Sequence, residues 1–261
     1  MEPRAWRPMS LRWEIAPPFE RADELARQLR TAPLVAQVLH NRGIDDADAG
    51  RAFLDPKLTD LHDPALLPGA DQAAERIARA VANREQIVIY GDYDVDGMTG
   101  VAILHAVLRL AGAGASFYVP HRLEEGYGLN SEAVDKLIAD GAKLLVTVDC
   151  GISAAGPIAR ARQAGVDVIV TDHHTPPEEL PPAAVIVHPR IPEGAYPNGD
   201  LSGAGVAFKL AWQLARRLCG NNRVDEPMRK FLLDATCMAA LGTIADVVPL
   251  VGENRVLATY G

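Results

Sequence analysis

The central part of the chain alternates between two patterns of hydrophobic and polar residues. Short runs that are apolar at nearly every position are separated by longer stretches in which apolar residues recur every three or four positions. The longer stretches are typical of helices with one buried face, and continuous apolar runs are typical of strands covered on both faces. The alternation predicts an α/β fold with a parallel sheet flanked by helices. The predicted strands are QIVIYG (86–91), ASFYVP (115–120), KLLVTVD (143–149), VDVIVTD (166–172) and AAVIVHP (183–189).

The periodic stretches predict helices between these strands and a mostly helical C-terminal part. The predicted helices are 71–82, Thr99–Leu110, Ser131–Asp140, Ser153–Gln163, Gly203–Leu218, Pro227–Leu241 and one that begins near Glu253. The first 70 residues are punctuated by proline and contain two short helical patterns. One, Leu34–Gly43, is ended by a glycine, and the other has Asp45 at its N-cap position. We therefore expect a small N-terminal helical segment, residues 1–70, followed by an α/β core, residues 71–261.

Composition narrows the possible partners only a little. The 261 residues carry a net charge of −8, whereas proteins that bind nucleic acid usually present a basic patch. This objection weakens if several aspartates bind divalent cations. No apolar run approaches the ~20 residues that span a bilayer, and the N-terminus lacks the pattern of a signal peptide. Three scattered cysteines predict neither a disulfide framework nor a zinc site. We expect a cytoplasmic protein without a membrane partner.

Acidic and histidine residues follow four of the predicted strands. The first strand leads into GDYDVDG (91–97), and later strands end at Asp149, at Asp172-His173-His174 and at His188. In an open α/β sheet, ligands bind beyond the carboxyl ends of the strands, so these side chains should meet at one edge. A single aspartate at a strand end more often caps a helix. Three aspartates within five residues, together with the acidic and histidine residues of the neighbouring strands, favour a metal site.

The chemistry of these side chains points to a particular class of metal. Carboxylates with one or two imidazoles suit Mn²⁺ or Mg²⁺ better than structural zinc. The spacing Asp92-x-Asp94-x-Asp96 keeps three carboxylates close, and without a cation they would raise one another's pKa values. Two ions about 3.5–4 Å apart could hold a phosphoryl group during hydrolysis.

Several blocks of the sequence resemble the successive motifs of the DHH phosphoesterase superfamily, and more narrowly those of RecJ-type exonucleases. The motif blocks are DYDVDG (92–97), VTVDCG (146–151), TDHH (171–174) and GTIADVVPL (242–250). Further similar blocks are NRGI (41–44), FLDP (53–56), IVIYGDYDVDGMTG (87–100), EGYGLN (125–130), DHHTPPEELPPA (172–183) and LSGAGVAFKL (201–210). The resemblance extends from about residue 30 to the end and identifies residues 71–261 as a DHH phosphoesterase core.

This resemblance implies a metal-dependent exonuclease of DNA repair and recombination. Such an enzyme hydrolyses single-stranded DNA from the 5′ end to 5′-mononucleotides, using two Mn²⁺ or Mg²⁺ ions and an activated water. The residues that match the family's metal ligands are Asp92, Asp94, Asp96, Asp149, His173 and Asp246, of which Asp149 matches the carboxylate shared by both ions. His174 is better placed as a donor to the scissile phosphate, so we count His174, Asp149 and His173 as catalytic. Only the resemblance points to Asp246.

The resemblance also implies contacts with single-stranded DNA. Arginine offers a bidentate fork for phosphate, and a glycine-rich turn before a helix offers backbone N–H groups. The candidate phosphate- and DNA-binding residues are Arg122, His188, Arg190, Ser202, Gly203 and Gly205. Chains of this family continue into a DHH-associated domain and an oligonucleotide-binding domain, which these 261 residues lack. We therefore expect a catalytic core with a weak grip on long DNA. A single-strand-binding protein and a helicase are the other expected partners.

Two alternatives follow from the same motifs. Some DHH enzymes act on oligoribonucleotides, cyclic dinucleotides or pyrophosphate, but these typically open with His-x-x-x-Asp-x-Asp, and here Tyr90 stands four residues before Asp94. The other alternative is a catalytically silent scaffold, as in a subunit of the eukaryotic replicative helicase. Such scaffolds lose metal ligands, whereas this sequence retains all of the expected ones.

Overall fold

The computed structural model describes residues 14–220 and 223–261. The chain divides into two compact units, Met1–Asp55 and Pro56–Gly261, whereas the sequence pattern had suggested a division near residue 70. Residues 56–70 belong to the larger unit because they contain two 3-10 helices, η1 (Leu58–Asp60) and η2 (Pro64–Leu66), which pack against helices from the end of the chain.

The described part of the smaller unit, residues 14–55, contains three short helices. They are α1 (Ala22–Leu29), α2 (Pro33–His40) and α3 (Ala47–Leu54). The sequence pattern did not predict α1, because half of its residues are polar and no side chain caps its first turn. It also placed the cap of α3 one residue too early. Asp46, rather than Asp45, accepts hydrogen bonds from two backbone N–H groups of that helix.

The larger unit is built on one sheet of five parallel strands in the order β2-β1-β3-β4-β5. The strands are β1 (Ile87–Gly91), β2 (Ser116–Tyr118), β3 (Leu144–Val148), β4 (Asp167–Thr171) and β5 (Val185–Val187). Each lies inside a predicted strand, so the predicted parallel α/β sheet is confirmed. The last residues of β1, β3, β4 and β5 are in register across the sheet, as Gly91, Val148, Thr171 and Val187 pair in turn. The residues that follow them therefore stand along one edge.

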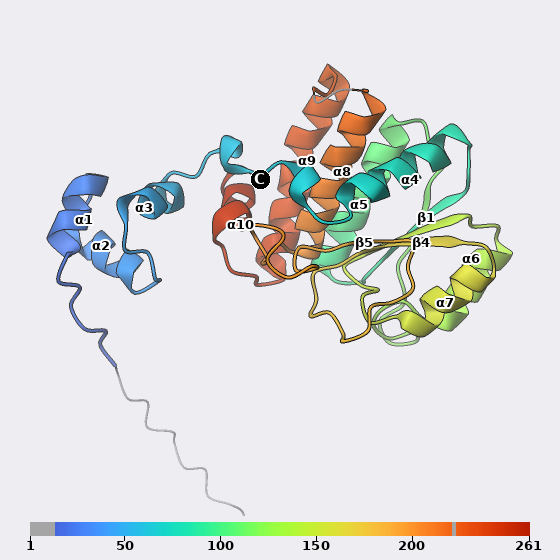
Figure 1. Ribbon diagram of the computed structural model, residues 1–261, viewed down its shortest axis with the longest axis horizontal. Coiled ribbons are helices and arrows are strands. Elements are labelled where there is room, and N and C mark those ends of the chain that lie inside the picture. The colour runs from blue at the N-terminus through green and yellow to red at the C-terminus, as the bar shows by residue number, and fades with distance from the viewer. Residues whose placement is uncertain (1–13, 221–222) are drawn as a thin grey trace, which may run out of the picture. The chain divides into compact units, whose positions relative to one another are not determined.

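Helices cover both faces of this sheet (Figure 1). On one face lie α6 (Ser131–Ala139) and α7 (Ala155–Gln163); on the other lie α4 (Ala70–Ala82), α5 (Val95–Leu110) and α8 (Gly203–Leu218). Successive residues of a strand point to opposite faces, so Ile87 and Ile89 join one core while Val88 and Tyr90 join the other. All of them are buried, which explains why the strands read as continuous apolar runs.

Two helices reach further toward the edge where the strands end than the sequence predicted. Helix α5 begins at Val95 instead of Thr99, because Asp94 accepts a hydrogen bond from the N–H of Gly97 and caps it. Helix α9 (Glu226–Ala245), which packs against α5 and α8, runs four residues past the predicted end at Leu241. Helix α10 (Gly252–Tyr260) completes the unit. Within the described ranges, no helix is both long enough and apolar enough to cross a bilayer.

Candidate metal centre

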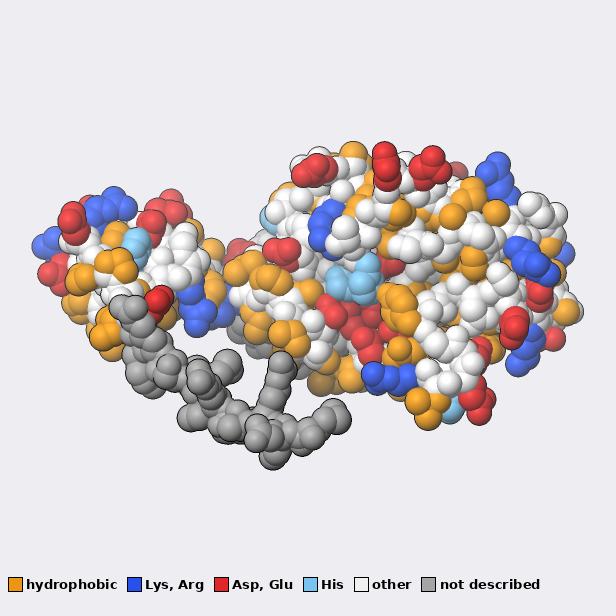
Figure 2. All heavy atoms as spheres, turned by 90° about the horizontal axis from the view of Figure 1, so that it is seen from below, with side chains coloured by type: hydrophobic (Ala, Val, Ile, Leu, Met, Phe, Trp, Pro, Cys, Tyr) orange, Lys and Arg blue, Asp and Glu red, His pale blue; other side chains and the backbone are white. Residues whose placement is uncertain are grey.

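Side chains of the metal-ligating types gather in three overlapping groups. In each group, one ligand atom per residue lies within 4.8 Å of the others. The groups are Asp92, Asp94 and Asp149; Asp96, His173 and Asp246; and Asp149, His173 and His174. Because Asp149 and His173 each belong to two groups, all three form a single cluster. Figure 2 shows acidic side chains directly beside histidine side chains in the middle of the larger unit's visible face.

The turn between β1 and α5 supplies three carboxylates to the cluster. Asp92 and Asp96 are buried, while Asp94 is exposed and caps α5. The chain turns tightly here, and a Cβ on Gly97 would lie 2.6 Å from the carbonyl oxygen of Asp92. Only glycine fits at that position without a shift of the backbone. The close path of the turn is what keeps the three carboxylates together.

Asp149 follows β3 in a strained backbone conformation. Its φ angle of 61° lies in the left-handed region, which costs a non-glycine residue about 1–3 kcal/mol. Its side chain is buried, and Oδ1 lies 3.1 Å from Nε2 of His173. The surrounding structure must therefore hold this turn in place.

Asp172 organises the segment after β4. Its Oδ1 accepts hydrogen bonds from the backbone N–H groups of His173 and His174 and lies 2.7 Å from Nδ1 of His174. Its Oδ2 accepts the N–H of Ile152 at 3.0 Å. Burial acts to raise the pKa of Asp172, but these hydrogen bonds, above all that from His174, hold it below its ordinary value. The carboxylate is thus ionised, so Nδ1 of His174 carries the proton of their hydrogen bond.

Asp246 reaches the cluster from the end of α9. Its Oδ2 lies 3.5 Å from Nε2 of His173, and Oδ2 of Asp96 lies 3.8 Å from the same nitrogen. Helix α9 approaches closely because Gly242 has no side chain; a Cβ there would overlap Oδ1 of Asp96. The structure therefore places Asp246 beside residues more than 70 positions earlier in the chain.

The donor set fits a divalent cation. Among the described residues, three buried atoms of this cluster have no hydrogen-bond partner: Oδ1 of Asp92, Oδ1 of Asp149 and Nε2 of His173. The last two lie 3.1 Å apart but do not form a hydrogen bond. Buried polar atoms nearly always have a partner, so three orphans in one place require an explanation. Carboxylate oxygens with an imidazole nitrogen are ligands that Mn²⁺ accepts. Cations bound at these groups would offer a partner to each of the three residues.

Electrostatics within the cluster point the same way. Burial, followed by repulsion from Asp96 and Asp94, raises the pKa of Asp149 to about 10. Burial likewise raises the pKa values of Asp92, Asp96 and Asp246 and lowers that of His173. The cluster thus resists the charged forms of its own side chains. Positive charge from a cation would favour the ionised carboxylates.

Ser202, Gly203 and Gly205, which the sequence predicts to bind phosphate or DNA, support the cluster from the start of α8. All three are buried at the start of α8. The N–H of Gly203 donates to Oδ2 of Asp96 at 2.6 Å, the N–H of Ala204 donates to Oδ1 at 2.9 Å, and the N–H of Gly205 donates to Oγ of Ser202. The helix N-terminus, which favours anions, therefore holds a carboxylate of the cluster instead of a phosphate. The predicted contact of Ser202, Gly203 and Gly205 with DNA stays a prediction.

His188 also supports the cluster from a buried position. It is fully buried, and its Nδ1 accepts the N–H of Arg190 at 3.0 Å. Its Nε2 must then carry the proton and donate to the carbonyl of His174 at 2.9 Å. The guanidinium of Arg190 donates to the carbonyl of His173. Both residues thus fix the backbone of the Asp172-His173-His174 segment, and the predicted contact of His188 with DNA stays a prediction.

The two predicted phosphate-binding arginines are exposed. Arg190 nevertheless donates a hydrogen bond to the carbonyl of His173. The guanidinium of Arg122 lies 5.0 Å from the ring centre of Tyr93. Their predicted contacts with phosphate stay predictions.

The sequence reasoning did not single out Tyr127, which lies at the cluster. Its hydroxyl lies 3.3 and 3.4 Å from the two ring nitrogens of His174 and 3.5 Å from the carbonyl oxygen of Asp149. The side chain is 56 % exposed, between two glycines of positive φ, Gly126 and Gly128. In the sequence, Tyr127 stands in the block EGYGLN (125–130), which resembles the family but was given no role.

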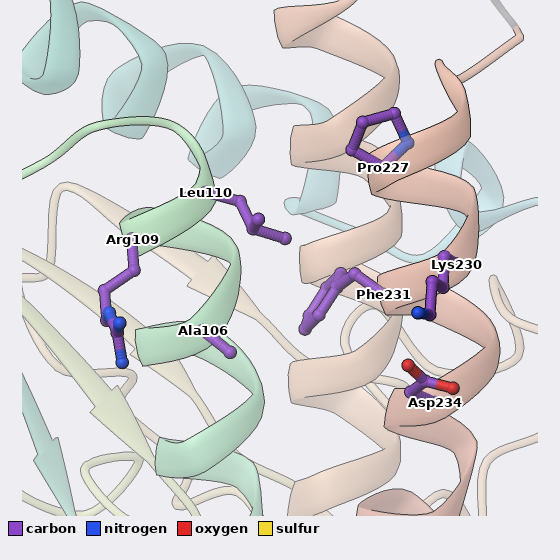
Figure 3. Close-up of a pocket in the computed structure, with 7 residues that line it drawn as sticks. All are labelled: Ala106, Arg109, Leu110, Pro227, Lys230, Phe231 and Asp234. Atoms are coloured by element: carbon purple, nitrogen blue, oxygen red, sulfur yellow. The ribbon is translucent and has the colours of Figure 1, made fainter.

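A pocket of about 500 Å³ lies away from this cluster, at the opposite ends of α5 and α9 (Figure 3). Its apolar floor includes Leu110 and Phe231, and Arg109, Lys230 and Asp234 line its sides. None of the cluster's ligand atoms lines it, so the candidate chemistry belongs to the edge of the sheet.

Comparison with known proteins gives one family and a consistent set of relatives. Residues 86–240 match the model of the DHH family, N-terminal domain. The chain is 45 % identical over 252 residues to the single-stranded-DNA-specific exonuclease RecJ of Bacillus subtilis, covering 96 % of this chain and 30 % of that protein. It is 43 % identical over 214 residues to the enzyme of the same name from Dickeya dadantii, covering 80 % of this chain and 37 % of that protein. The chain thus spans about a third of these curated relatives.

Solved structures agree with the sequence comparison. A crystal structure of an exonuclease RecJ bound to manganese is 41 % identical, with a TM-score of 0.68, and covers 78 % of this chain and 49 % of that chain. RecJ of Thermus thermophilus in complex with Mn²⁺ is 36 % identical, with a TM-score of 0.75, covering 94 % and 33 % of the two chains. Its Mg²⁺ complex is 33 % identical, with a TM-score of 0.63, covering 94 % and 30 %.

Proposed function

The chain belongs to the DHH family, and on that premise we propose that it is the metal-dependent catalytic part of an exonuclease specific for single-stranded DNA. The relatives named above support the class of substrate. The solved relatives bound to Mn²⁺ and Mg²⁺ support the class of metal. The proposed reaction is hydrolysis of phosphodiester bonds from the 5′ end, releasing 5′-mononucleotides.

One observation carries this proposal more than any other. The ligand atoms come from the ends of β1, β3, β4 and α9, which are far apart in the sequence, and three of these atoms are buried without a hydrogen-bond partner. A scaffold without a cation would leave them unsatisfied, at a cost of about 1–3 kcal/mol each. The proposed ligands are Asp92, Asp94, Asp96, Asp149, His173 and Asp246, with Asp149 shared between two ions.

Each part of the cluster has a distinct proposed task. When bound, two divalent cations supply positive charge that stabilises a phosphoryl group under attack and lower the pKa of the attacking water. Asp172 orients His174 through Nδ1, and this hydrogen bond is the largest cause that raises the pKa of His174 to about 9. His174 therefore keeps its second ring proton at neutral pH and can donate it to the leaving oxygen. Arg122 and Arg190 remain the proposed contacts to phosphate.

The proposal is tested with single-stranded oligonucleotides labelled at either end. With Mn²⁺, we expect a 5′ label to appear at once in mononucleotides, while a 3′ label stays in long products until late. EDTA should abolish release, and blunt duplex, short RNA and cyclic dinucleotides should be cut far more slowly. Preferred cleavage of cyclic dinucleotides or short RNA would instead support the alternative DHH activities.

A pair of variants separates the metal cluster from general effects on the protein. Asp149→Asn keeps the size of the side chain but removes a proposed ligand charge, and we expect activity to fall about 100-fold or more. Asp135→Asn changes a partly exposed aspartate on α6 that pairs with Arg160, and we expect no change. Full activity of Asp149→Asn would contradict the proposal.

We also propose partners and a compartment. A single-strand-binding protein and a helicase would supply single-stranded substrate, and the cytoplasm would be the place of action. Pull-down with each partner class, with and without single-stranded DNA, would test these associations.

A further inference from the structure

Asp149 is one of the few non-glycine residues whose backbone lies in the left-handed region. Among the described residues, the other non-glycine residues with positive φ are Arg30, Arg84 and Val247. Of these four, only Asp149 is fully buried, and it alone belongs to two of the three ligand groups. A strained conformation persists only where neighbouring groups enforce it. The contacts of this turn must therefore hold Asp149 in the left-handed conformation.

Thr147, the next-to-last residue of β3, lies directly under this turn. Its side chain is fully buried, and its Oγ1 donates a hydrogen bond to the carbonyl oxygen of Cys150 at 2.7 Å. The bond links the end of the strand to the residue just after Asp149. It closes the chain from residue 147 to residue 150 into a small loop that has Asp149 at its bend.

Gly151 shows how closely Thr147 fits the turn. Its φ angle is 109°, and a Cβ on Gly151 would lie 2.7 Å from Oγ1 of Thr147. The threonine side chain thus touches the turn on the far side of Asp149 as well. The hydroxyl has room to reach the Cys150 carbonyl only because residue 151 lacks a side chain.

A second threonine ties the same strand end to the neighbouring strand. Oγ1 of Thr171, the last residue of β4, donates to the carbonyl oxygen of Thr147 at 2.7 Å. The backbone N–H of Asp149 donates to the carbonyl of Thr171 at 3.0 Å. The position of Thr147 is thus fixed from β4, immediately before the Asp172-His173-His174 segment.

We propose that Thr147 is a positioning residue for the metal centre, whose hydroxyl holds the left-handed turn that directs the Asp149 carboxylate into the cluster. This inference rests on the proposed function, because it assumes that Asp149 is a metal ligand. It adds a residue that touches no ligand atom and acts only through the backbone of the turn. Loss of the hydroxyl frees the Cys150 carbonyl and lets the turn relax to a more common conformation.

Metal binding by three variants tests this role. Thr147→Val keeps the shape but removes the hydroxyl, Thr147→Ser keeps the hydroxyl, and Thr147→Ala has neither the hydroxyl nor the full shape. We expect the dissociation constant for Mn²⁺, measured by calorimetry, to rise about tenfold or more in the valine and alanine variants. It should stay within about threefold of the unchanged protein in the serine variant. If the valine variant does not fold, the comparison of serine with alanine decides the matter.

Electron paramagnetic resonance measures the spin coupling between two bound Mn²⁺ ions, which general destabilisation of the protein does not change. Two Mn²⁺ ions that share the Asp149 carboxylate give a spin-coupled spectrum, and we expect this coupling to change in Thr147→Val at saturating metal. The control is Thr236→Val, which removes another buried threonine hydroxyl, bonded to the carbonyl of Leu233 in α9. It should lose stability without losing coupling.

The outcomes separate the two proposals. If the unchanged protein binds no Mn²⁺, the proposed function fails. If the unchanged protein binds Mn²⁺ and Thr147→Val binds it with the same affinity and coupling, only the role of Thr147 is overturned. A loss of affinity as large in Thr236→Val would also overturn that role.

Discussion

Nδ1 of His174 lies 2.7 Å from Oδ1 of Asp172, and the same oxygen accepts the backbone N–H groups of His173 and His174. One buried carboxylate oxygen thus fixes both the backbone and the ring of this segment. The hydrogen bond is the largest cause of the raised pKa of His174, ahead of burial, which opposes it. The folded protein therefore keeps this imidazole protonated up to about pH 9, whereas the unfolded chain loses the proton near pH 6.5.

Asp172→Asn should lower the pKa of His174 from about 9 toward its ordinary value near 6.5. The amide has no negative charge, and its single oxygen cannot satisfy all of the donors that now converge on the carboxylate. The measurement is a titration of the histidine ring protons by nuclear magnetic resonance in the metal-free protein. Signals of the other histidines report whether the change is local. An unchanged His174 titration would mean that Asp172 does not set its charge.

The same interaction predicts a change in pH dependence of stability. A raised histidine pKa stabilises the folded state fully below pH 6.5, and this contribution is lost as pH rises through about 9. In Asp172→Asn, the stabilising contribution of protonated His174 should be lost completely at a lower pH than in the unchanged protein. Urea unfolding of the metal-free proteins at pH 6, 8 and 9 tests this. Equal pH dependence of the two proteins would contradict the assignment.

Metal binding should stabilise the protein more strongly as pH rises. Burial and the neighbouring aspartates raise the pKa of Asp149 to about 10, compared with 3.8 for an ordinary aspartate. The metal-free folded state therefore holds a proton that the unfolded state releases, and stability falls between these two values as pH rises. A cation that replaces the proton removes this loss.

The difference in melting temperature with and without Mg²⁺ should accordingly be larger at pH 8 than at pH 6. Calorimetry in buffers of different ionisation enthalpy should show proton release on binding. Asp149→Asn is the matched control, because it cannot release a proton at this position and should lose most of the pH dependence. A metal effect that is equal at both pH values would count against Asp149 as a ligand.

The strand cores were predictable because their signal is local. The apolar runs around Ile89, Val146 and Ile169 need cover on both faces, and only a sheet between helix layers provides it. Boundaries near the cluster were less predictable. The start of α5 depends on Asp94 bonding to Gly97, and the same aspartate also suits a loop or a metal.

The candidate metal cluster was only partly predictable. Residues at the ends of parallel strands, such as Asp149 and His173, could be grouped because strand ends share an edge. Asp246 stands at the end of a helix, and nothing in its surroundings distinguishes it from an ordinary C-terminal carboxylate. The bonds from the glycine-rich turn to Asp96 were not predicted, because N–H groups at a helix start suit phosphate and carboxylate equally. Only the fold brings Asp96 to Gly203.

Removal of one partner from the buried ion pair of Lys209 and Glu253 should strongly destabilise the protein. Both side chains are fully buried and form a direct ion pair. Lys209 also donates to the carbonyl of His62 at 2.6 Å, and Glu253 accepts from the hydroxyl of Tyr196 at 2.5 Å. The pair thus joins α8, α10 and the segment between η1 and η2.

Lys209→Met should lower the free energy of unfolding by about 3–5 kcal/mol, because it leaves the Glu253 charge buried without its partner. Adding Glu253→Gln should recover part of this loss. Arg160→Ala, which breaks the more exposed pair with Asp135, should cost less than about 1 kcal/mol. Urea unfolding at pH 7 measures all of these. A loss under about 1 kcal/mol in Lys209→Met would show that water reaches the pair.

Two glycines in the first turn of α8 provide a matched test of the cluster's packing. A Cβ on Gly203 would lie 2.6 Å from both Cβ and Oδ1 of Asp149, whereas the nearest atom to a Cβ on Gly205 is the flexible end of Leu201 at 3.2 Å. Gly203→Ala should therefore displace the Asp149 carboxylate and weaken the hydrogen bond that residue 203 makes to Asp96. We expect Mn²⁺ affinity to fall about 10–100-fold, with a loss of about 1–3 kcal/mol in stability from overpacking.

Gly205→Ala should leave metal affinity unchanged, and the greater helix propensity of alanine should offset the tighter contact. Calorimetric titration with Mn²⁺ and urea unfolding measure the two effects separately. Both changes add the same methyl group to the same helical turn and differ only in the atoms that this group contacts. If Gly203→Ala and Gly205→Ala bound Mn²⁺ equally well, the start of α8 would therefore have no part in shaping the site.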